Sequence, residues 1–175
     1  MLNIKKRRTR NNVCNAVLIV LLFNFSLYSQ TNNNFEFTLT SPMFANSTPN
    51  QAINIQFPGV PVWGWIEVTI TSFYNSQFSA GKLTKRYQIG HNPGSYFNQK
   101  TEVADAFGAI ATQWHIGDFN HDTNTIPIYH LVSTNNFLVI KIEGVLTDPT
   151  YANTVKTGTT LSAIETVVAP GGRHI

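Results

Sequence analysis

Cysteine is nearly absent from this sequence. Its 175 residues include one cysteine, Cys14, which lies in an N-terminal segment with the features of a cleaved leader. The chain that follows has no cysteine, so it has no disulfide, no thiol nucleophile and no thiolate ligand for a metal. Its fold must therefore depend on a hydrophobic core, and the remaining length of about 146 residues is enough to build one.

Charge is also scarce, and its sign misleads. Charged residues make up 12% of the sequence, and the formal net charge is +3. Five of the twelve Lys and Arg residues lie before residue 11, so the rest of the chain has seven of them against nine Asp and Glu. The net charge after residue 29 is about −2. Such a chain lacks the basic surface that a nucleic-acid partner requires, and we expect no such partner.

Motifs of the common enzyme classes are missing as well. The sequence contains neither a G-x-S-x-G elbow nor an H-E-x-x-H zinc motif. A glycosidase needs two carboxylates beside one cleft, whereas Glu67, Glu143 and Glu165 each fit an outward polar position on a predicted strand. We therefore expect no catalytic residue and no cofactor, and a secreted hydrolase stays an alternative.

The N-terminal segment has the plan of a secretory signal peptide. Basic residues 5–8 precede an apolar run at 17–23, and the small residue Ser29 precedes Gln30. The alternative, an uncleaved membrane anchor, is disfavoured because the apolar run is short for a span. Residues 1–29 are the predicted signal peptide, so we expect a secreted protein, extracellular or periplasmic, without membrane association after cleavage. The cysteine-free composition favours a bacterial source.

The most regular pattern after the leader is a predicted β-hairpin at residues 63–90. Apolar and polar side chains alternate through residues 63–74 and again through 81–90, with turn-forming residues at 75–80 between them. A period of two is typical of a strand with one buried and one wetted face. The predicted inward residues of the first strand are Ile66, Val68 and Ile70; Trp65, Glu67, Thr69 and Thr71 are outward.

Other alternating segments predict more strands and no long helix. Leu138, Ile140 and Ile142 form the inward set of the most apolar one. Residues 96–106 have no periodicity and are predicted to be a loop or one short helical turn. About eight strands with regular turns predict an all-β, antiparallel β-sandwich, jelly-roll-like, in one domain over residues 30–175; a closed barrel is the alternative. The remaining predicted strands cover residues 35–40, 52–57, 108–119, 126–132, 137–143 and 160–168.

Two tryptophans are the strongest candidates for a binding site. Trp63 and Trp65 share the polar side of their predicted strand. Indole rings on a polar face can stack on sugar rings or anchor a partner protein. The alternative is that both rings pack beneath a loop near Pro58 and Pro61, since large aromatic side chains are mostly buried.

One loop has the spacing of a calcium site. Asp118, Asn120 and Asp122 follow the D-x-N-x-D pattern, and alternate oxygen ligands suit a hard cation. The loop departs from a full EF-hand, because its sixth position is Thr123 and its twelfth is Tyr129. The alternative interpretation is a hairpin loop rich in turn-forming residues, and we expect no metal.

Two histidines also fall on adjacent predicted strands. His115 and His130 could lie near each other, but zinc requires three or four ligands with supporting contacts. Histidines on strands are more often solvent-facing, and this is the interpretation that the sequence favours.

The order of these strands resembles a C-terminal domain of phage tail-fibre-like and related bacterial surface proteins. The resemblance covers residues 63–168 and is carried by the hairpin, by Trp114–Asp118 followed by Ile126–His130, and by the apolar strand Phe137–Gly144. It implies a β-sandwich tip that binds a surface receptor, often as a trimer. It assigns no role to any individual residue.

These observations favour a secreted β-sandwich binding module that is adhesin-like or that binds a receptor or carbohydrate. Its expected partner is a cell-surface glycan or protein receptor. The resemblance also implies a homo-oligomer, such as a trimer. One alternative is a structural subunit that self-assembles through strand edges. The other is the secreted hydrolase.

The signal peptide leads to the first testable prediction. N-terminal sequencing of protein recovered from the periplasm or culture medium should give a sequence that begins close to Gln30, because the small residue Ser29 ends the predicted leader. A mature protein that still begins at Met1 would contradict it.

Overall fold

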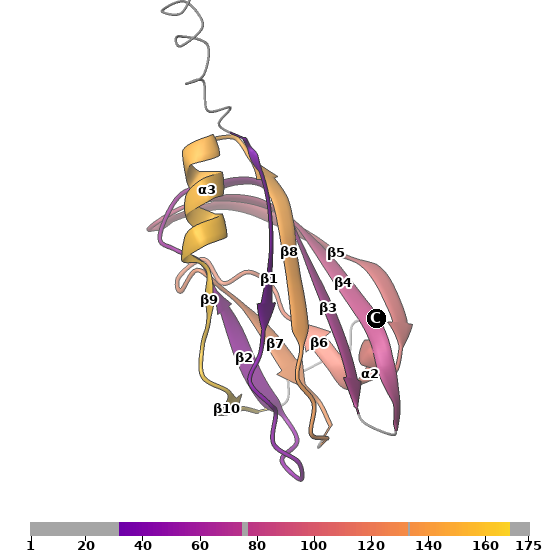
Figure 1. Cartoon of the computed structure of the whole chain (residues 1–175). Coiled ribbons are helices and arrows are strands. Elements are labelled where there is room, and N and C mark those ends of the chain that lie inside the picture. Colours follow the sequence, from indigo (N-terminus) through magenta and orange to yellow (C-terminus); the bar gives the residue numbers. More distant parts are fainter. Residues whose placement is uncertain (1–31, 75–76, 133, 169–175) are drawn as a thin grey trace, which may run out of the picture. The chain divides into compact units, whose positions relative to one another are not determined.

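Two antiparallel sheets pack face to face in the computed structural model, which describes residues 32–74, 77–132 and 134–168 (Figure 1). The first sheet has five strands in the order β1-β8-β3-β4-β5. The second has the order β10-β2-β7-β6, and β9 pairs with β2. The elements are β1 (Asn34–Thr40), β2 (Gln51–Gln56), β3 (Val62–Tyr74), β4 (Gln77–Asn92), β5 (Ser95–Gly108), α2 (Ile110–Gln113), β6 (Trp114–Ile116), β7 (Thr125–His130), β8 (Val139–Leu146), α3 (Pro149–Gly158), β9 (Thr160–Leu161) and β10 (Glu165–Thr166).

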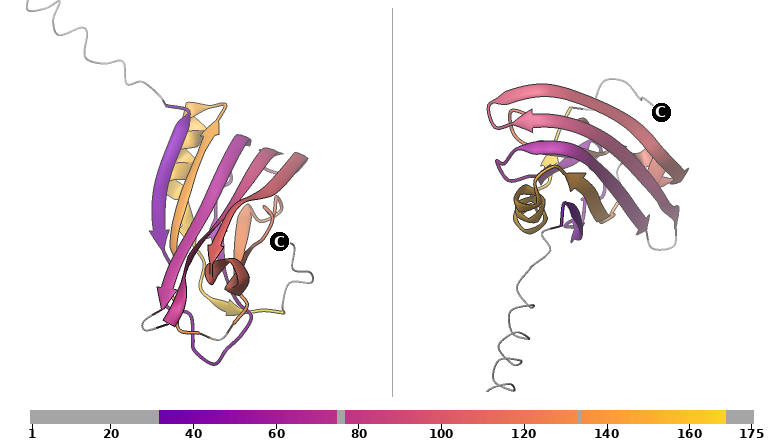
Figure 2. Two further views of the ribbon diagram at one scale, coloured as in Figure 1. Left: turned by 90° about the vertical axis from the view of Figure 1, so that its right-hand side faces the viewer. Right: turned by 90° about the horizontal axis from the view of Figure 1, so that it is seen from above.

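The predicted all-β sandwich is confirmed, and the described residues form ten strands where the sequence predicted about eight. The long strands β3, β4 and β5 follow one another as adjacent hairpin partners and curve together over the second sheet (Figure 2). The predicted signal peptide at residues 1–29 lies outside the described residues, as does the predicted cleavage point. Within the described residues, no helix combines the length and the apolar character needed to cross a membrane.

The core between the sheets is built from the inward residues that the alternation predicted. Each of the six predicted inward side chains on β3 and in the segment around β8 is completely buried. They meet isoleucines of β2 and β7 from the second sheet, which are equally buried. Because the side-chain period of a strand is two, this burial fixes which residues of β3 and β8 face outward. The six residues are Ile66, Val68, Ile70, Leu138, Ile140 and Ile142.

Gly64 allows β3 to approach β8 closely. Its φ is +154°, and a Cβ at this position would collide with the backbone carbonyl oxygen of Val145. Only a residue without a side chain fits there. Its two neighbours, Trp63 and Trp65, are two residues apart and therefore share the outer face of the sheet, opposite Gly90 and Gln88 of β4.

The structure corrects the prediction for residues 96–106. The segment is part of β5, a fourteen-residue strand, and not a loop or helical turn. Every residue of β5 except Gln99 is exposed, and Gln99 is half-buried. A strand at the edge of a sheet that lacks cover on either face is under no demand to alternate apolar and polar residues, so the pattern carried no strand signal.

A second correction concerns α3, a ten-residue helix between two predicted strands, where the sequence analysis predicted no long helix. Asp148 is its N-cap, and its carboxylate accepts a hydrogen bond from the backbone N–H of Thr150 at 2.7 Å, with Pro149 in the first turn. Both are start signals of a helix. Ala152 and Val155 are the buried residues of this helix, and α3 lies against β1 and β8.

The burial of Ile140 gives a prediction for stability. Ile140→Ala should lower the free energy of unfolding by about 2–5 kcal/mol, because it removes three buried carbons and leaves a cavity. Lys141→Ala, on the outward side of the same strand, should cost much less, because its ion pairs are exposed to water. Denaturant unfolding measures both values, and a cost for Ile140→Ala below about 0.5 kcal/mol would mean that the faces of β8 are reversed.

Candidate functional site

A row of charged side chains crosses the outer face of the five-stranded sheet. One residue comes from each strand, and each pair of neighbours in the row is directly opposite in register. Four of the five are glutamates and the fifth is an arginine. From β1 to β5, in the order of the strands, the row is Glu36, Glu143, Glu67, Arg86 and Glu102.

Two basic side chains hold this row together. Arg86 donates from Nε to Glu67, and its Nη1 lies 3.7 Å from Oε1 of Glu102. Lys141 lies between Glu143, at 3.0 Å, and Glu36, at 3.2 Å. The hydrogen bond to Glu67 raises the pKa of Arg86, and the hydrogen bond to Glu143 raises the pKa of Lys141. Since the two basic side chains are largely exposed, these pairs add little to stability, and their effect is to fix side-chain positions on the face.

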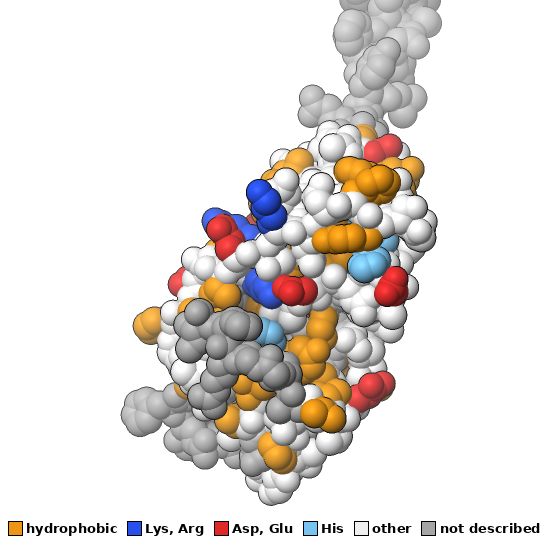
Figure 3. Space-filling view, turned by 180° about the vertical axis from the view of Figure 1, so that it is seen from behind, with side chains coloured by type: hydrophobic (Ala, Val, Ile, Leu, Met, Phe, Trp, Pro, Cys, Tyr) orange, Lys and Arg blue, Asp and Glu red, His pale blue; other side chains and the backbone are white. Residues whose placement is uncertain are grey.

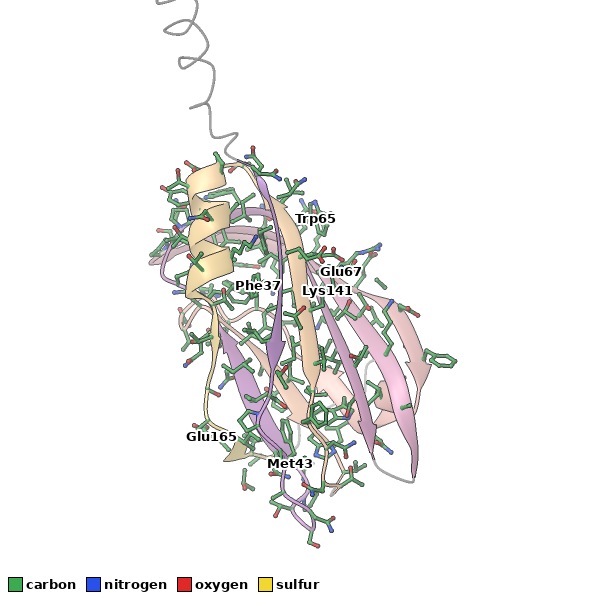
Figure 4. The ribbon with its side chains drawn as sticks, in the orientation of Figure 1. Phe37, Met43, Trp65, Glu67, Lys141 and Glu165 are labelled. Atoms are coloured by element: carbon green, nitrogen blue, oxygen red, sulfur yellow. The ribbon has the colours of Figure 1, made fainter. Side chains whose placement is uncertain are left out.

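Trp65 stands in the next row along the sheet, opposite Gln88, which is opposite Lys100. Its indole is 42% exposed. A groove of about 600 Å³ runs from this ring over β4 and β5, between the charged row and Lys100. Figure 4 shows Trp65, Glu67 and Lys141 close together on β3 and β8.

A second groove lies on the other side of the same ring. Its volume is about 410 Å³, and it is lined by outward residues of β1 and β8, including Asn34 and Glu143, and by Lys156 of α3. Trp65 is therefore an apolar ridge between two polar grooves. On the face opposite to the view of Figure 1, basic, acidic and apolar side chains are interspersed (Figure 3).

Trp63 shares the outer face with Trp65, as predicted, but its ring is held by its neighbours. Its Nε1–H donates to Oδ1 of Asn92 at 2.7 Å, and its ring centre lies 4.9 Å from that of Phe97. A Cβ at Gly90 would come within 3.1 Å of the indole, so the ring covers the backbone of β4. The sequence analysis treated the two rings alike, as both exposed or both packed. In the structure the ring of Trp65 is open, whereas the ring of Trp63 is packed against its neighbours.

The calcium candidates are engaged in contacts within the chain. Asp118 accepts a hydrogen bond from Lys85 at 2.7 Å, and this bond lowers the pKa of its carboxyl. Asn120 accepts from the backbone N–H of Asp122 at 2.9 Å, which is the geometry of an Asx turn. These contacts support the interpretation of a hairpin loop. Among the described residues, no three His, Cys, Asp or Glu side chains gather as a metal site would require.

The two strand histidines do not converge. His115 lies opposite Tyr129, with ring centres 5.8 Å apart, whereas His130 lies opposite Trp114. The expectation that both face solvent is wrong for His130, which is completely buried. Its ring stacks on Trp114 at 4.1 Å and meets the edge of Phe44 at 5.3 Å. The sequence could not show this, because the alternation along β7 is compatible with a histidine on either face of the strand.

The charged row across the five strands was not predicted from the sequence. Its members lie far apart along the chain, and only the pairing register brings them together. The only part of the row that the sequence indicated was the outward position of Glu67 and Glu143, which the sequence analysis did assign. Their alignment depends on the strand order, which alternation alone does not give.

Comparisons with known proteins give a limited likeness. No family model matches the chain, and no curated protein matches it. One similar solved structure is the tailspike protein gp49 of Acinetobacter baumannii bacteriophage Fri1, a capsular polysaccharide depolymerase (TM-score 0.42, 13% identity, 93% of this chain and 24% of that one). Another is the tailspike protein of Acinetobacter phage vB_ApiP_P1 (TM-score 0.39, 10% identity, 83% of this chain and 24% of that one).

Both of these structures are phage tail proteins, the broad class to which the sequence showed a resemblance. This chain spans about a quarter of the length of each. At such TM-scores and identities the likeness establishes neither common function nor shared site residues.

Burial of His130 predicts a loss of stability in mild acid. Burial lowers the pKa of His130 from 6.5 to about 4, so the unfolded chain takes up a proton over this range before the folded one does. The free energy of unfolding should therefore fall as the pH drops from about 6.5 to 4, by up to about 3 kcal/mol from this group. Burial also lowers the pKa of His91, which adds to the same trend.

The variant His130→Phe isolates this effect. Denaturant unfolding at several pH values should show a flatter dependence for His130→Phe than for the natural chain. His121→Gln is the control, because its ring is 41% exposed. Equal slopes for the natural chain and for His130→Phe would contradict the prediction.

Proposed function

We propose that this chain is an exported binding module that holds a cell-surface glycan on the outer face of its five-stranded sheet. The observation that supports the proposal most directly is Trp65, a 42% exposed indole that stands beside a groove lined with polar and charged side chains. Export rests on the predicted signal peptide at residues 1–29.

The chemistry around Trp65 suits a sugar ring. A sugar presents an apolar C–H face, which can lie on an indole, and a rim of hydroxyl groups, which need hydrogen-bond partners. Arg86 and Gln88 provide donors and Glu67 provides acceptors in the groove beside Trp65. The ion pair of Arg86 with Glu67 holds both groups in place before a ligand arrives, which lowers the entropy cost of binding.

The two grooves favour an extended ligand over a single sugar. They meet at Trp65, and together they cross the sheet from β5 to β1. A sugar stacked on Trp65 would have polar groups on both sides, with Gln88 in one groove and Asn34 in the other. The site is therefore suited to an internal unit of a polysaccharide.

Binding without turnover is the function that these carboxylates support best. The carboxylates that a glycosidase could use form two directly opposed pairs, Glu67 with Glu143 and Glu36 with Glu143. Each carboxylate is already engaged by a cation, Glu67 by Arg86 and the other two by Lys141. A secreted hydrolase is the second candidate, and the test for it is release of reducing ends from the bound polysaccharide.

A glycan array tests the proposal on the mature chain, with variants of the two tryptophans. Trp65→Ala should weaken binding to the best glycan on the order of tenfold or more, because a central stacking contact is lost. Trp65→Phe should recover part of the loss. Trp63→Phe is the matched control, and it should bind like the natural chain because Trp63 does not face the grooves.

Thermal unfolding of each variant completes the experiment. Trp65→Ala should melt close to the natural chain, since its ring is outside the core. A large fall in melting temperature would place Trp65 among the packed residues. Absence of any array signal, together with cell binding that depends on Trp65, would identify a protein receptor in place of a glycan.

A further inference from the structure

The outer edge of β5 is a long strand edge without a partner among the described residues. β5 is the last strand of its sheet and is fourteen residues long, with no proline. Its unpaired N–H and C=O groups form a template for another strand. The opposite edge strand, β1, is half as long and has α3 lying against it, and the edge strands of the second sheet have two or three residues.

Two irregularities divide this edge into segments. The pairing of β4 with β5 shifts between Gly90 and His91, where Phe97 is skipped, and between Thr84 and Lys85, where Ala104 is skipped. Bulges bend a strand and interrupt its ladder. The regular part of the edge is therefore the six residues 98–103.

Symmetry restricts how a second copy can pair with this segment. Antiparallel pairing of two identical strands follows a twofold axis, so one residue of the strand lies opposite itself. Residues that face each other must also share a face of the sheet, which holds for any such register centred on a residue. Within 98–103 the self-paired residue can be Gln99, Lys100, Thr101 or Glu102.

Charge selects one of these four registers. Centring on Lys100 or on Glu102 places like charges opposite each other, which is destabilising. Centring on Gln99 pairs Lys100 with Asn98 and leaves Glu102 outside the regular segment. Centring on Thr101 pairs Lys100 with Glu102 of the second copy twice, and both residues face outward and are exposed.

We propose that β5 pairs with β5 of a second copy of this chain about Thr101, with two reciprocal ion pairs between Lys100 and Glu102. No ion pair within the described chain engages Lys100. Glu102 is 68% exposed and lies at 3.7 Å from Arg86, so it can accept a second cation. The result is a dimer with one continuous ten-stranded sheet, where the resemblance in the sequence implied a trimer.

The dimer has a consequence that rests on the proposed glycan site. A twofold axis perpendicular to the sheet keeps the two outer faces on the same side, so both Trp65 grooves point in one direction. The two copies of β3 are five strand spacings apart, or about 24 Å. Two sites at this separation can hold one repetitive polysaccharide and raise its apparent affinity.

Charge exchange tests the pairing. The natural mature chain should have the mass of two chains by light scattering after size-exclusion chromatography. Lys100→Glu and Glu102→Lys should each shift the mass to that of one chain at the same concentration, because each places like charges together. The double variant Lys100→Glu/Glu102→Lys should restore the dimer, since the attraction returns with its sign exchanged.

Two controls make the result specific. Lys156→Glu makes the same change of charge on α3 and should stay a dimer. Thr101→Cys should form a disulfide between copies under mild oxidation, because a self-paired residue in an antiparallel ladder has a Cα separation of about 4.5–5.5 Å. Val103→Cys should not, since its partner is Gln99 and the mature chain has no other cysteine.

The outcomes that would overturn the proposal are distinct from those for glycan binding. A natural chain with the mass of one chain or of three, or a double variant that stays monomeric while folded by circular dichroism, would contradict the β5 pairing. If the dimer forms and glycans do not bind, the pairing holds and the proposed function fails.

Discussion

Alternation of apolar and polar side chains along the long strands is the constraint on which the rest of this structure depends. The sequence contains a single cysteine, so the chain can form no internal disulfide, and the core must hold the two sheets together by burial alone. Ile66, Val68 and Ile70 on β3 can be buried in only one register, because a shift by one residue would expose all three. The same register places Trp65 and Glu67 on the outer face.

The burial of the core residues therefore also determines which side chains lie on the outer face. The charged row crosses five strands because their pairing aligns one outward residue from each. Two glycines provide space that a side chain would fill. Gly64 allows β3 to approach β8 closely, and Gly90 makes room for the ring of Trp63. With Trp63 packed, Trp65 is the indole available to a ligand.

The sequence predicted the fold class and the faces of β3 and β8. One side of each of these strands faces the core and the other faces water, so apolar and polar residues alternate with a period of two. It failed for β5, which is exposed on both faces, and for α3, whose signals at Asp148 and Pro149 are also turn signals. It identified the two tryptophans as outward residues but not their difference, since that depends on Asn92 and Phe97 from the next hairpin. Contacts between distant segments leave no mark in local periodicity.

The three indole N–H groups of this chain provide the most direct test of the account, because each has a different environment. Nε1 of Trp63 donates a hydrogen bond to Asn92, Nε1 of Trp114 is buried and has no hydrogen-bond partner among the described residues, and the ring of Trp65 is open. Their resonances can be followed by two-dimensional ¹⁵N NMR while the strongest glycan from the array is added. The account predicts that the Trp65 resonance shifts and that those of Trp63 and Trp114 stay in place. A glycan that binds without moving the Trp65 resonance would contradict it.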